Sequence, residues 1–458
     1  MIGMLEAQLQ AIVSGRHVVR GSGRGPNLVV RPASTDEVSQ CLAVLRSHAQ
    51  PVVALGGLTG LVGGTDAPSS FVGLSTERLN SVESFDSERR QILVGAGVKL
   101  EQVHDFADAH RLRYGVDLGA RGSCTIGGNI ATNAGGNSVV RFGMTRANIA
   151  GLEVVLSDGS VLSDLGGLAK NNAGYDLKQL FIGSEGTLGI VTRALLKLNR
   201  PSSGTSSALL AVESFEDALV VTSALEAGCG DALLALEIMW NRYFTTVGPA
   251  VMKGGPLPLS DKHTFYLLAQ VEGRDRGASS EEMLLDALGG AECIADSAYA
   301  RTSAQEKLFW AIRDGSELVE RLHRSVISFD VSMRPRDYAS YVGEIEATLH
   351  RRLPGAITYC FGHLADGNVH FMIGHDEPAM DTQLLIEECV YEPLARYRPS
   401  SISAEHGIGR EKAGHLWRSR SAPEIAAMNA IRAALDPTAI LNPHIRYEPA
   451  PRAAGDRL

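Results

Sequence analysis

The chain lacks the features that would place it in a membrane or in an oxidising compartment. Its six cysteines are scattered along 458 residues and form no C-x-x-C pair, which favours a reduced, cytoplasmic setting over a disulfide framework. No apolar run approaches the length of a bilayer span. Residues 1–20 lack the segments of a secretory signal and resemble an amphipathic helix instead. The sequence therefore predicts a soluble protein whose membrane contact, if it has one, is peripheral.

Positive charge is also scarce. The formal net charge is −9, and no run of lysine or arginine is long enough to form a basic patch. This balance excludes a grip on a phosphate backbone and weighs against an anionic membrane surface as partner. Hydrophobic residues make up 44% and charged residues 21% of the chain, which is typical of a globular protein with two or three domains.

Glycine, in contrast, is abundant and clustered. Most of the dense clusters among the 49 glycines fall in the N-terminal half, in residues 21–25, 56–64, 95–97, 119–143 and 183–189. Clustered glycine allows the backbone to approach a ligand closely or to adopt positive φ at many turns. The N-terminal half is therefore predicted to hold a large ligand.

The loop Gly56–Gly64 directly follows an apolar strand predicted at 51–55. Successive backbone N–H groups in such a loop can bind phosphate oxygens. The loop is not G-x-G-x-x-G and lacks the lysine of a nucleoside-triphosphate loop, which disfavours a nicotinamide-binding or NTPase domain. A plain surface loop remains the alternative.

A second glycine-rich stretch, Asp117–Gly136, is too long to be a simple turn. Its small and amide side chains suit the surroundings of a pyrophosphate and an isoalloxazine ring. Residues 201–207 then mark a change of composition and a domain boundary. Helical and strand patterns alternate beyond it, which predicts one sheet with helices on a face.

Two histidines flank the dipeptide Asp366-Gly367, which is typical of a two-residue hairpin turn. Such a hairpin would place His363 directly opposite His370, with Cβ atoms about 5 Å apart, close enough to share a metal ion. Glu405 could supply a third ligand. The alternative is a pair of hydrogen-bonded histidines in a sheet, with Glu405 as an acid at a helix start.

Seven motifs occur in an order that resembles one family, the FAD-linked D-2-hydroxyacid dehydrogenases of the vanillyl-alcohol-oxidase (PCMH) type. D-2-hydroxyglutarate dehydrogenases look nearest, with D-lactate dehydrogenases and the glycolate oxidase catalytic subunit as relatives. The motifs span most of the chain: Pro32–Val38, Gly56–Gly64, Asp117–Gly136, Gly183–Gly189, Gly362–His370, Ser403–Gly409 and Asp436–Pro443.

The resemblance implies an α+β fold, in which a PCMH-type two-subdomain FAD-binding module is followed by an α/β cap. We expect an N-terminal helix at 1–21, the FAD module at 22–201, the cap at 202–421 and a segment returning to the flavin at 422–458. FAD would be bound without a covalent link, because the first glycine loop carries Thr59 and no histidine. The residues expected to contact FAD are Gly56, Gly57, Thr59, Gly60, Gly63, Asp117, Ser123, Gly127, Gly128, Asn129, Thr132, Asn133, Gly135, Gly136, Glu185, Gly186, Ile190 and Asn442.

The resemblance also implies a reaction, oxidation of a D-2-hydroxy acid to the 2-oxo acid. The N5 atom of FAD would accept the hydride. A divalent metal on His363, His370 and Glu405 would lower the pKa of the substrate hydroxyl; zinc suits these ligands, and manganese and iron also accept them. His406 is the expected base. Arg313 would grip the substrate carboxylate, although a salt bridge on a helix surface is the alternative.

Three positions depart from the pattern of the hydroxyglutarate enzymes. A threonine, a lysine and an asparagine are replaced here by Glu317, Ser328 and Met372. A second substrate carboxylate would meet less positive charge, so we expect a shorter or less charged hydroxy acid, such as D-lactate. An enzyme specific for D-2-hydroxyglutarate is the alternative.

Two other functional classes remain open from the sequence. A non-redox transferase on the same scaffold is disfavoured because the chain has no histidine run. A metal hydrolase or binding module would leave the glycine-rich half without a role. The expected partners are a small 2-hydroxy acid and an electron acceptor, which could be a quinone, a cytochrome or an electron-transferring flavoprotein. The oligomeric state is open, with a homodimer as one option.

Overall fold

The computed structural model describes residues 2–21, 25–273, 278–376 and 380–451. The chain divides into two compact units. The first contains residues 1–136, 142–201 and 405–458, and the second contains 137–141 and 202–404. The division falls after Pro201, within the predicted composition break. The chain returns to the first unit at residue 405, and the expected boundary between the cap and the C-terminal segment at 421/422 stays a prediction.

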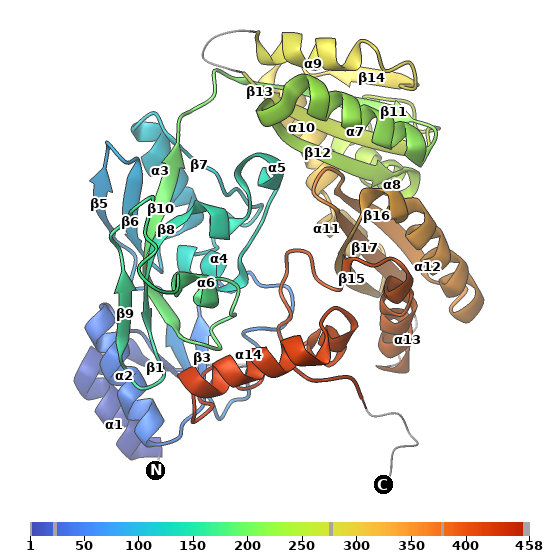
Figure 1. Cartoon of the computed structure of the whole chain (residues 1–458). Helices are drawn as coiled ribbons and strands as arrows, with labels where there is room; N and C mark the ends of the chain where they lie inside the picture. The colour runs from blue at the N-terminus through green and yellow to red at the C-terminus, as the bar shows by residue number, and fades with distance from the viewer. Residues whose placement is uncertain (1, 22–24, 274–277, 377–379, 452–458) are drawn as a thin grey trace. The chain divides into compact units, whose positions relative to one another are not determined.

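The first unit is built on two sheets (Figure 1). The smaller has the order β1-β2-β4-β3, and its last three strands are parallel. Helices α1 (Ile2–Val13) and α2 (Thr35–Ser47) pack against each other beside it. Its strands are β1 (Val18–Arg20), β2 (Leu28–Val30), β3 (Val52–Leu55) and β4 (Val72–Ser75).

The larger sheet of this unit has the order β5-β6-β10-β8-β9, with β7 paired to β10. Its strands are β5 (Val82–Asp86), β6 (Gln91–Gly95), β7 (Arg113–Tyr114), β8 (Ile149–Val155), β9 (Val161–Asp164) and β10 (Ile190–Asn199). The helices that follow or cover them are α3 (Leu100–Ala109), α4 (Ile126–Thr132) and α6 (Lys178–Phe181). Helix α14 (Ala422–Leu435) belongs to the same unit. Two sheets in one unit agree with the expected two-subdomain module.

The C-terminal segment extends the smaller sheet. Leu441 forms a parallel bridge with Val52 on β3, and the N–H group of Asn442 donates to the Val52 carbonyl at 2.8 Å. The segment is thereby fixed at the strand that leads into the first glycine loop. None of the helices within the described ranges is long and apolar enough to cross a membrane.

The second unit contains one eight-stranded sheet, in the order β14-β11-β13-β12-β16-β17-β15-β18. Its strands are β11 (Thr205–Val212), β12 (Leu233–Trp240), β13 (Phe265–Glu272), β14 (Asp296–Tyr299), β15 (Ser325–Met333), β16 (Ile357–His363), β17 (Asn368–His375) and β18 (Ser400–Ser401). Its helices include α7 (Phe215–Cys229), α8 (Asn241–Met252), α9 (Ser280–Leu288), α10 (Ser303–Asp314), α11 (Glu317–Glu320), α12 (Tyr338–Arg352) and α13 (Met380–Tyr391). Figure 1 shows α7 and α9 side by side over this sheet.

The β16–β17 hairpin corrects one prediction. His363 pairs with Asn368, and His370 pairs with Phe361, so the two histidines are not directly opposite each other. The turn contains the four residues 364–367, and the N–H group of Leu364 donates to the Leu236 carbonyl of β12. Since the register shift is an even number of residues, both histidines still face the same side of the sheet.

Candidate functional site

The two densest glycine segments of the first unit are in direct contact. A Cβ atom on Gly57 would lie 2.2 Å from the Ser123 carbonyl oxygen, and one on Gly56 would lie 2.8 Å from Thr125 Oγ1. Only glycine allows this approach of two backbones. At Gly60, an added Cβ would meet no atom of the described residues within 4 Å. The loop is therefore packed at its start and borders open space further on.

The third predicted flavin segment joins the same region through helix α4. The N–H groups of Gly183 and Glu185 donate to the carbonyls of Ile130 and Ala131 at 2.9 and 2.7 Å. Thr125 caps the start of the helix, where its hydroxyl accepts from the Gly128 N–H. Three stretches predicted from separate parts of the sequence thus surround one short helix.

Asn442 and Glu185 hold the C-terminal segment in place. The Asn442 amide donates to the Glu185 carbonyl at 2.7 Å and accepts from the Ala54 N–H at 2.9 Å. The Glu185 carboxylate accepts from the N–H groups of Ile408 and Gly409. Burial raises the pKa of Glu185, although these two backbone donors oppose the shift. Both side chains therefore have structural partners in addition to their expected contact with FAD.

Other residues expected at the flavin are also tied to protein groups. Asp117 accepts from Arg121 at 3.0 Å, and Thr132 donates to the Gly128 carbonyl. Asn133 adopts a left-handed conformation and accepts from the Arg146 N–H. The structure places these residues around helix α4, and their contact with FAD stays a prediction.

In the second unit, polar side chains form a row across β12, β16 and β17, where β16 ends and β17 begins. Glu237 pairs with His363, which in turn pairs with Asn368. On the next row, His370 pairs with Asp330 of β15. Directly paired residues point to the same face of a sheet, so these five side chains share one face.

His363, His370 and Glu405 offer ligand atoms that all lie within 4.8 Å of one another. Glu405 is brought there by its neighbour, because the Ala404 N–H donates to the Asp330 carboxylate at 3.0 Å. Two imidazoles and a carboxylate at this spacing are a donor set that suits a divalent transition metal. The predicted ligands are therefore gathered even though the predicted hairpin register is wrong.

Glu237 determines which ring nitrogen of His363 carries the hydrogen. Its carboxylate lies 2.9 Å from Nδ1 of His363, and because a carboxylate only accepts, Nδ1 carries the hydrogen and Nε2 keeps its lone pair. Glu237 is 1% exposed. Burial opposes its charge, but the positive charge of Arg313 and the hydrogen bond from His363 hold the pKa of Glu237 below its usual range. A buried carboxylate behind a histidine is the usual second partner of a metal-bound imidazole.

Arg313 has partners that the sequence did not predict. Its guanidinium donates to Glu237 at 2.8 Å and to Asp314 at 3.0 Å, and it lies 3.0 Å from Nε2 of His363. The side chain is 8% exposed, which excludes a salt bridge on a helix surface. Its proposed grip on a substrate carboxylate remains a prediction.

Sequence reasoning missed Glu237 and Asn368. A signal for Glu237 was present, because it is the one charged residue in the apolar strand Leu233–Trp240, and an acid in such a strand requires a buried partner. Asn368 had no comparable signal, since asparagine after Asp-Gly reads as part of a turn.

The three positions that depart from the hydroxyglutarate pattern fall in different surroundings. Ser328 pairs with Met372 across β15 and β17, and Met372 lies on the same face as His370. Met372 is buried and packs in an apolar cluster with Phe361 and Tyr359. Glu317 is exposed at the start of α11 and pairs with Arg321. Beyond His370 the sheet thus carries the buried thioether of Met372 and the exposed hydroxyl of Ser328, and neither residue carries a charge.

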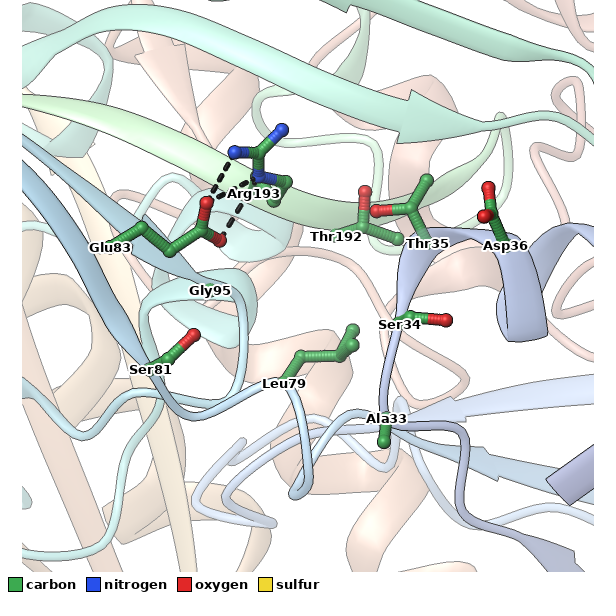
Figure 2. Close-up of a pocket in the computed structure, with 10 residues that line it drawn as sticks. All are labelled: Ala33, Ser34, Thr35, Asp36, Leu79, Ser81, Glu83, Gly95, Thr192 and Arg193. Atoms are coloured by element: carbon green, nitrogen blue, oxygen red, sulfur yellow. Dashed lines mark hydrogen bonds and ion pairs between the residues drawn. The ribbon is translucent and has the colours of Figure 1, made fainter.

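A separate pocket of the first unit is lined by residues of α2, β5, β6 and β10 and neighbouring loops (Figure 2). Glu83 and Arg193 point toward each other on its wall and form a two-pronged ion pair. The lining residues are Ala33, Ser34, Thr35, Asp36, Leu79, Ser81, Glu83, Gly95, Thr192 and Arg193. None of them belongs to the set expected to contact FAD.

Comparison with known proteins matches two domain families. Residues 26–164 match the FAD binding domain, and residues 202–445 match the C-terminal domain of FAD linked oxidases. A D-2-hydroxyglutarate dehydrogenase of Xanthomonas citri pv. viticola is 36% identical over 95% of this chain and 92% of that protein. A mitochondrial D-2-hydroxyglutarate dehydrogenase of Arabidopsis thaliana is 36% identical over 93% of this chain and 76% of that protein.

The fold is shared with more distant proteins. The structure of p-cresol methylhydroxylase with substrate bound superimposes with a TM-score of 0.77 and covers 98% of this chain and 97% of that chain. Its sequence is 15% identical, so this likeness extends to the fold alone.

Proposed function

The chain belongs to the family of FAD-linked D-2-hydroxyacid dehydrogenases, and on this premise we propose that it oxidises a D-2-hydroxy acid at a metal held by His363, His370 and Glu405. The observation that carries the proposal is the convergence of these three ligands within 4.8 Å in a chain whose relatives act on such an acid. FAD supplies the hydride acceptor at N5. A divalent metal at this site would polarise the hydroxyl and carboxylate of the substrate.

His363 would act through Nε2, since Nδ1 is occupied by Glu237. A metal ion bound at Nε2 of His363 would displace the Arg313 guanidinium from that nitrogen. The guanidinium would then turn one N–H group toward the substrate carboxylate, while Glu237 and Asp314 keep it in place. This exchange reconciles the buried position of Arg313 with its proposed role.

His406 is the proposed base. It follows the ligand Glu405 directly in the sequence, and a neutral imidazole can take the hydroxyl proton near neutral pH. We infer that Glu405 acts as a metal ligand and His406 as the proton acceptor. His406→Gln should then lower kcat while substrate binding is largely kept.

The proposed substrate has a short or apolar side chain. A group at the far end of the substrate would meet Met372 and Ser328, which face each other across the strands. A thioether and a hydroxyl offer no charge to a second carboxylate. D-lactate or D-2-hydroxybutyrate should therefore be turned over more efficiently than D-2-hydroxyglutarate.

The test is the absorbance spectrum of the purified protein during anaerobic addition of D- and L-2-hydroxy acids, before and after chelation. We expect a flavin band that bleaches with D-acids and stops bleaching when the metal is removed. Protein without flavin would favour a metal hydrolase or binding module. A bound flavin that no 2-hydroxy acid reduces would favour the non-redox transferase. A clear preference for D-2-hydroxyglutarate would overturn the substrate proposal alone.

A further inference from the structure

Asn368 has a buried amide that nothing in the protein satisfies. The residue is 3% exposed, and neither its Nδ2 nor its Oδ1 has a hydrogen-bond partner among the residues that the structure describes. A buried polar group left without a partner costs about 1–3 kcal/mol. Such a cost is tolerated where the group serves function rather than folding.

The position of this amide relates it to the metal ligands. Asn368 pairs directly with His363 across the hairpin and shares its sheet face with His370, two residues along β17. Side chains paired in this way have Cβ atoms about 5 Å apart. The unsatisfied amide is therefore a neighbour of both imidazoles that we propose as metal ligands.

The hydrogen-bonding groups of an amide limit the class of ligand that Asn368 would bind. Its two N–H groups donate to a carboxylate, whereas the surrounding acids Glu237 and Asp330 can only accept when charged. Every 2-hydroxy acid carries a carboxylate next to the reacting carbon, whatever its side chain. A donor at Asn368 would therefore recognise the part of the substrate that all members of the class share.

We propose that Asn368 is a substrate-binding residue whose Nδ2 donates to the α-carboxylate of the 2-hydroxy acid. The inference rests on the proposed function. The carboxylate keeps its charge while the alcohol becomes a ketone, so the contact is equally strong in the ground state and the transition state. Loss of such uniform binding raises KM and leaves kcat nearly unchanged.

The test compares Asn368→Leu with the wild-type holoenzyme. Leucine has a similar size and no polar atoms, so KM for the hydroxy acid should rise about 10- to 100-fold, the usual effect of losing a hydrogen bond to a charged group. The dissociation constant of the 2-oxo acid, followed by the flavin spectrum, should rise equally. Asn368→Asp should bind both acids more weakly still, because it loses the donors and adds a negative charge.

Stability separates this role from a structural one. Because no protein group depends on the amide, Asn368→Leu should melt at the wild-type temperature or above it. The matched control is Asn241→Leu in the same unit, where the amide donates to the carbonyls of Asp261 and His263 at 2.8 and 2.7 Å. That variant should melt at a lower temperature and keep the wild-type KM.

Several results would overturn the inference. A lower melting temperature for Asn368→Leu with unchanged KM would make the amide structural. A fall in kcat at constant KM would place its contact at the reacting oxygen. A weaker dissociation constant for Zn²⁺, measured by titration of the chelated protein, would make Asn368 a metal ligand. If the wild type itself reduces no flavin with any hydroxy acid, the proposed function fails first.

Discussion

Replacing Glu237 by glutamine should weaken the proposed metal site at His363, His370 and Glu405. One carboxylate oxygen accepts from Nδ1 of His363 and the other from the Arg313 guanidinium. A glutamine places an NH₂ group at one of these two positions. If the NH₂ group faces Arg313, it and the guanidinium are two hydrogen-bond donors that face each other. If it faces His363, the hydrogen must move to Nε2, and that nitrogen can no longer bind a metal.

The expected magnitude follows from the burial of the pair. Glu237 and Arg313 are 1% and 8% exposed, and removing one partner of a buried ion pair typically costs about 3–5 kcal/mol. Loss of the residue that orients a metal-bound histidine typically lowers metal affinity about 10- to 100-fold. The free energy of unfolding of the Glu237→Gln apoprotein should therefore be lower than that of the wild type, or its affinity for the metal should be lower, or both.

The assay is urea unfolding of the chelated protein together with calorimetric titration of Zn²⁺. Glu306→Gln is the matched control, since this acid of the same unit accepts from the Thr205 and Ser207 hydroxyls and not from a histidine. It should leave the zinc dissociation constant unchanged. If Glu237→Gln keeps both the wild-type free energy of unfolding and the wild-type zinc affinity, the assigned tautomer of His363 is wrong.

Three further outcomes are expected. Gly57→Ala should lower the free energy of unfolding by about 1–3 kcal/mol and reduce retained flavin, because its Cβ would lie 2.2 Å from the Ser123 carbonyl, whereas Gly15→Ala, outside the expected flavin set and with no atom of the described residues within 4 Å of the added Cβ, should change neither. The pKa of Glu185 is raised in the folded protein, so the stability that it contributes is present in acid and is lost as pH rises through this folded pKa. The free energy of unfolding of Glu185→Gln, measured in urea, should therefore increase relative to that of the wild type from acidic to neutral pH. In native thiol labelling Cys293, the one cysteine that is not buried, should react first, and all six should react after unfolding.

Elements with local signals could be predicted closely from the sequence. The sequence Ser34-Thr-Asp-Glu37 is typical of a helix start, and α2 begins there, where the Ser34 hydroxyl accepts from the Glu37 N–H. At α9, Ser279 and Glu282 form a reciprocal cap. These signals act within four residues, so they need no knowledge of the fold.

Features that depend on distant strands could not be predicted in this way. Asp366-Gly367 favours a two-residue turn, but the loop has four residues, and the N–H group of Leu364 at its start donates to the Leu236 carbonyl of β12. The pairing of Glu237 with His363 joins residues 126 apart in sequence. Both depend on β12 lying beside β16, which no local pattern in either strand encodes.

The charges around the histidines link the metal proposal to the substrate proposal. Glu237, Asp314, Asp330 and Glu405 are four carboxylates, and the guanidinium of Arg313 bonds to the first two of them. A substrate carboxylate entering such surroundings would be repelled, because like charges are weakly screened where water is excluded. A divalent cation would offset two of the negative charges, and a neutral donor such as the Asn368 amide adds none. We infer that the metal must be bound before the acid, so that chelation abolishes substrate binding and not the chemical step alone.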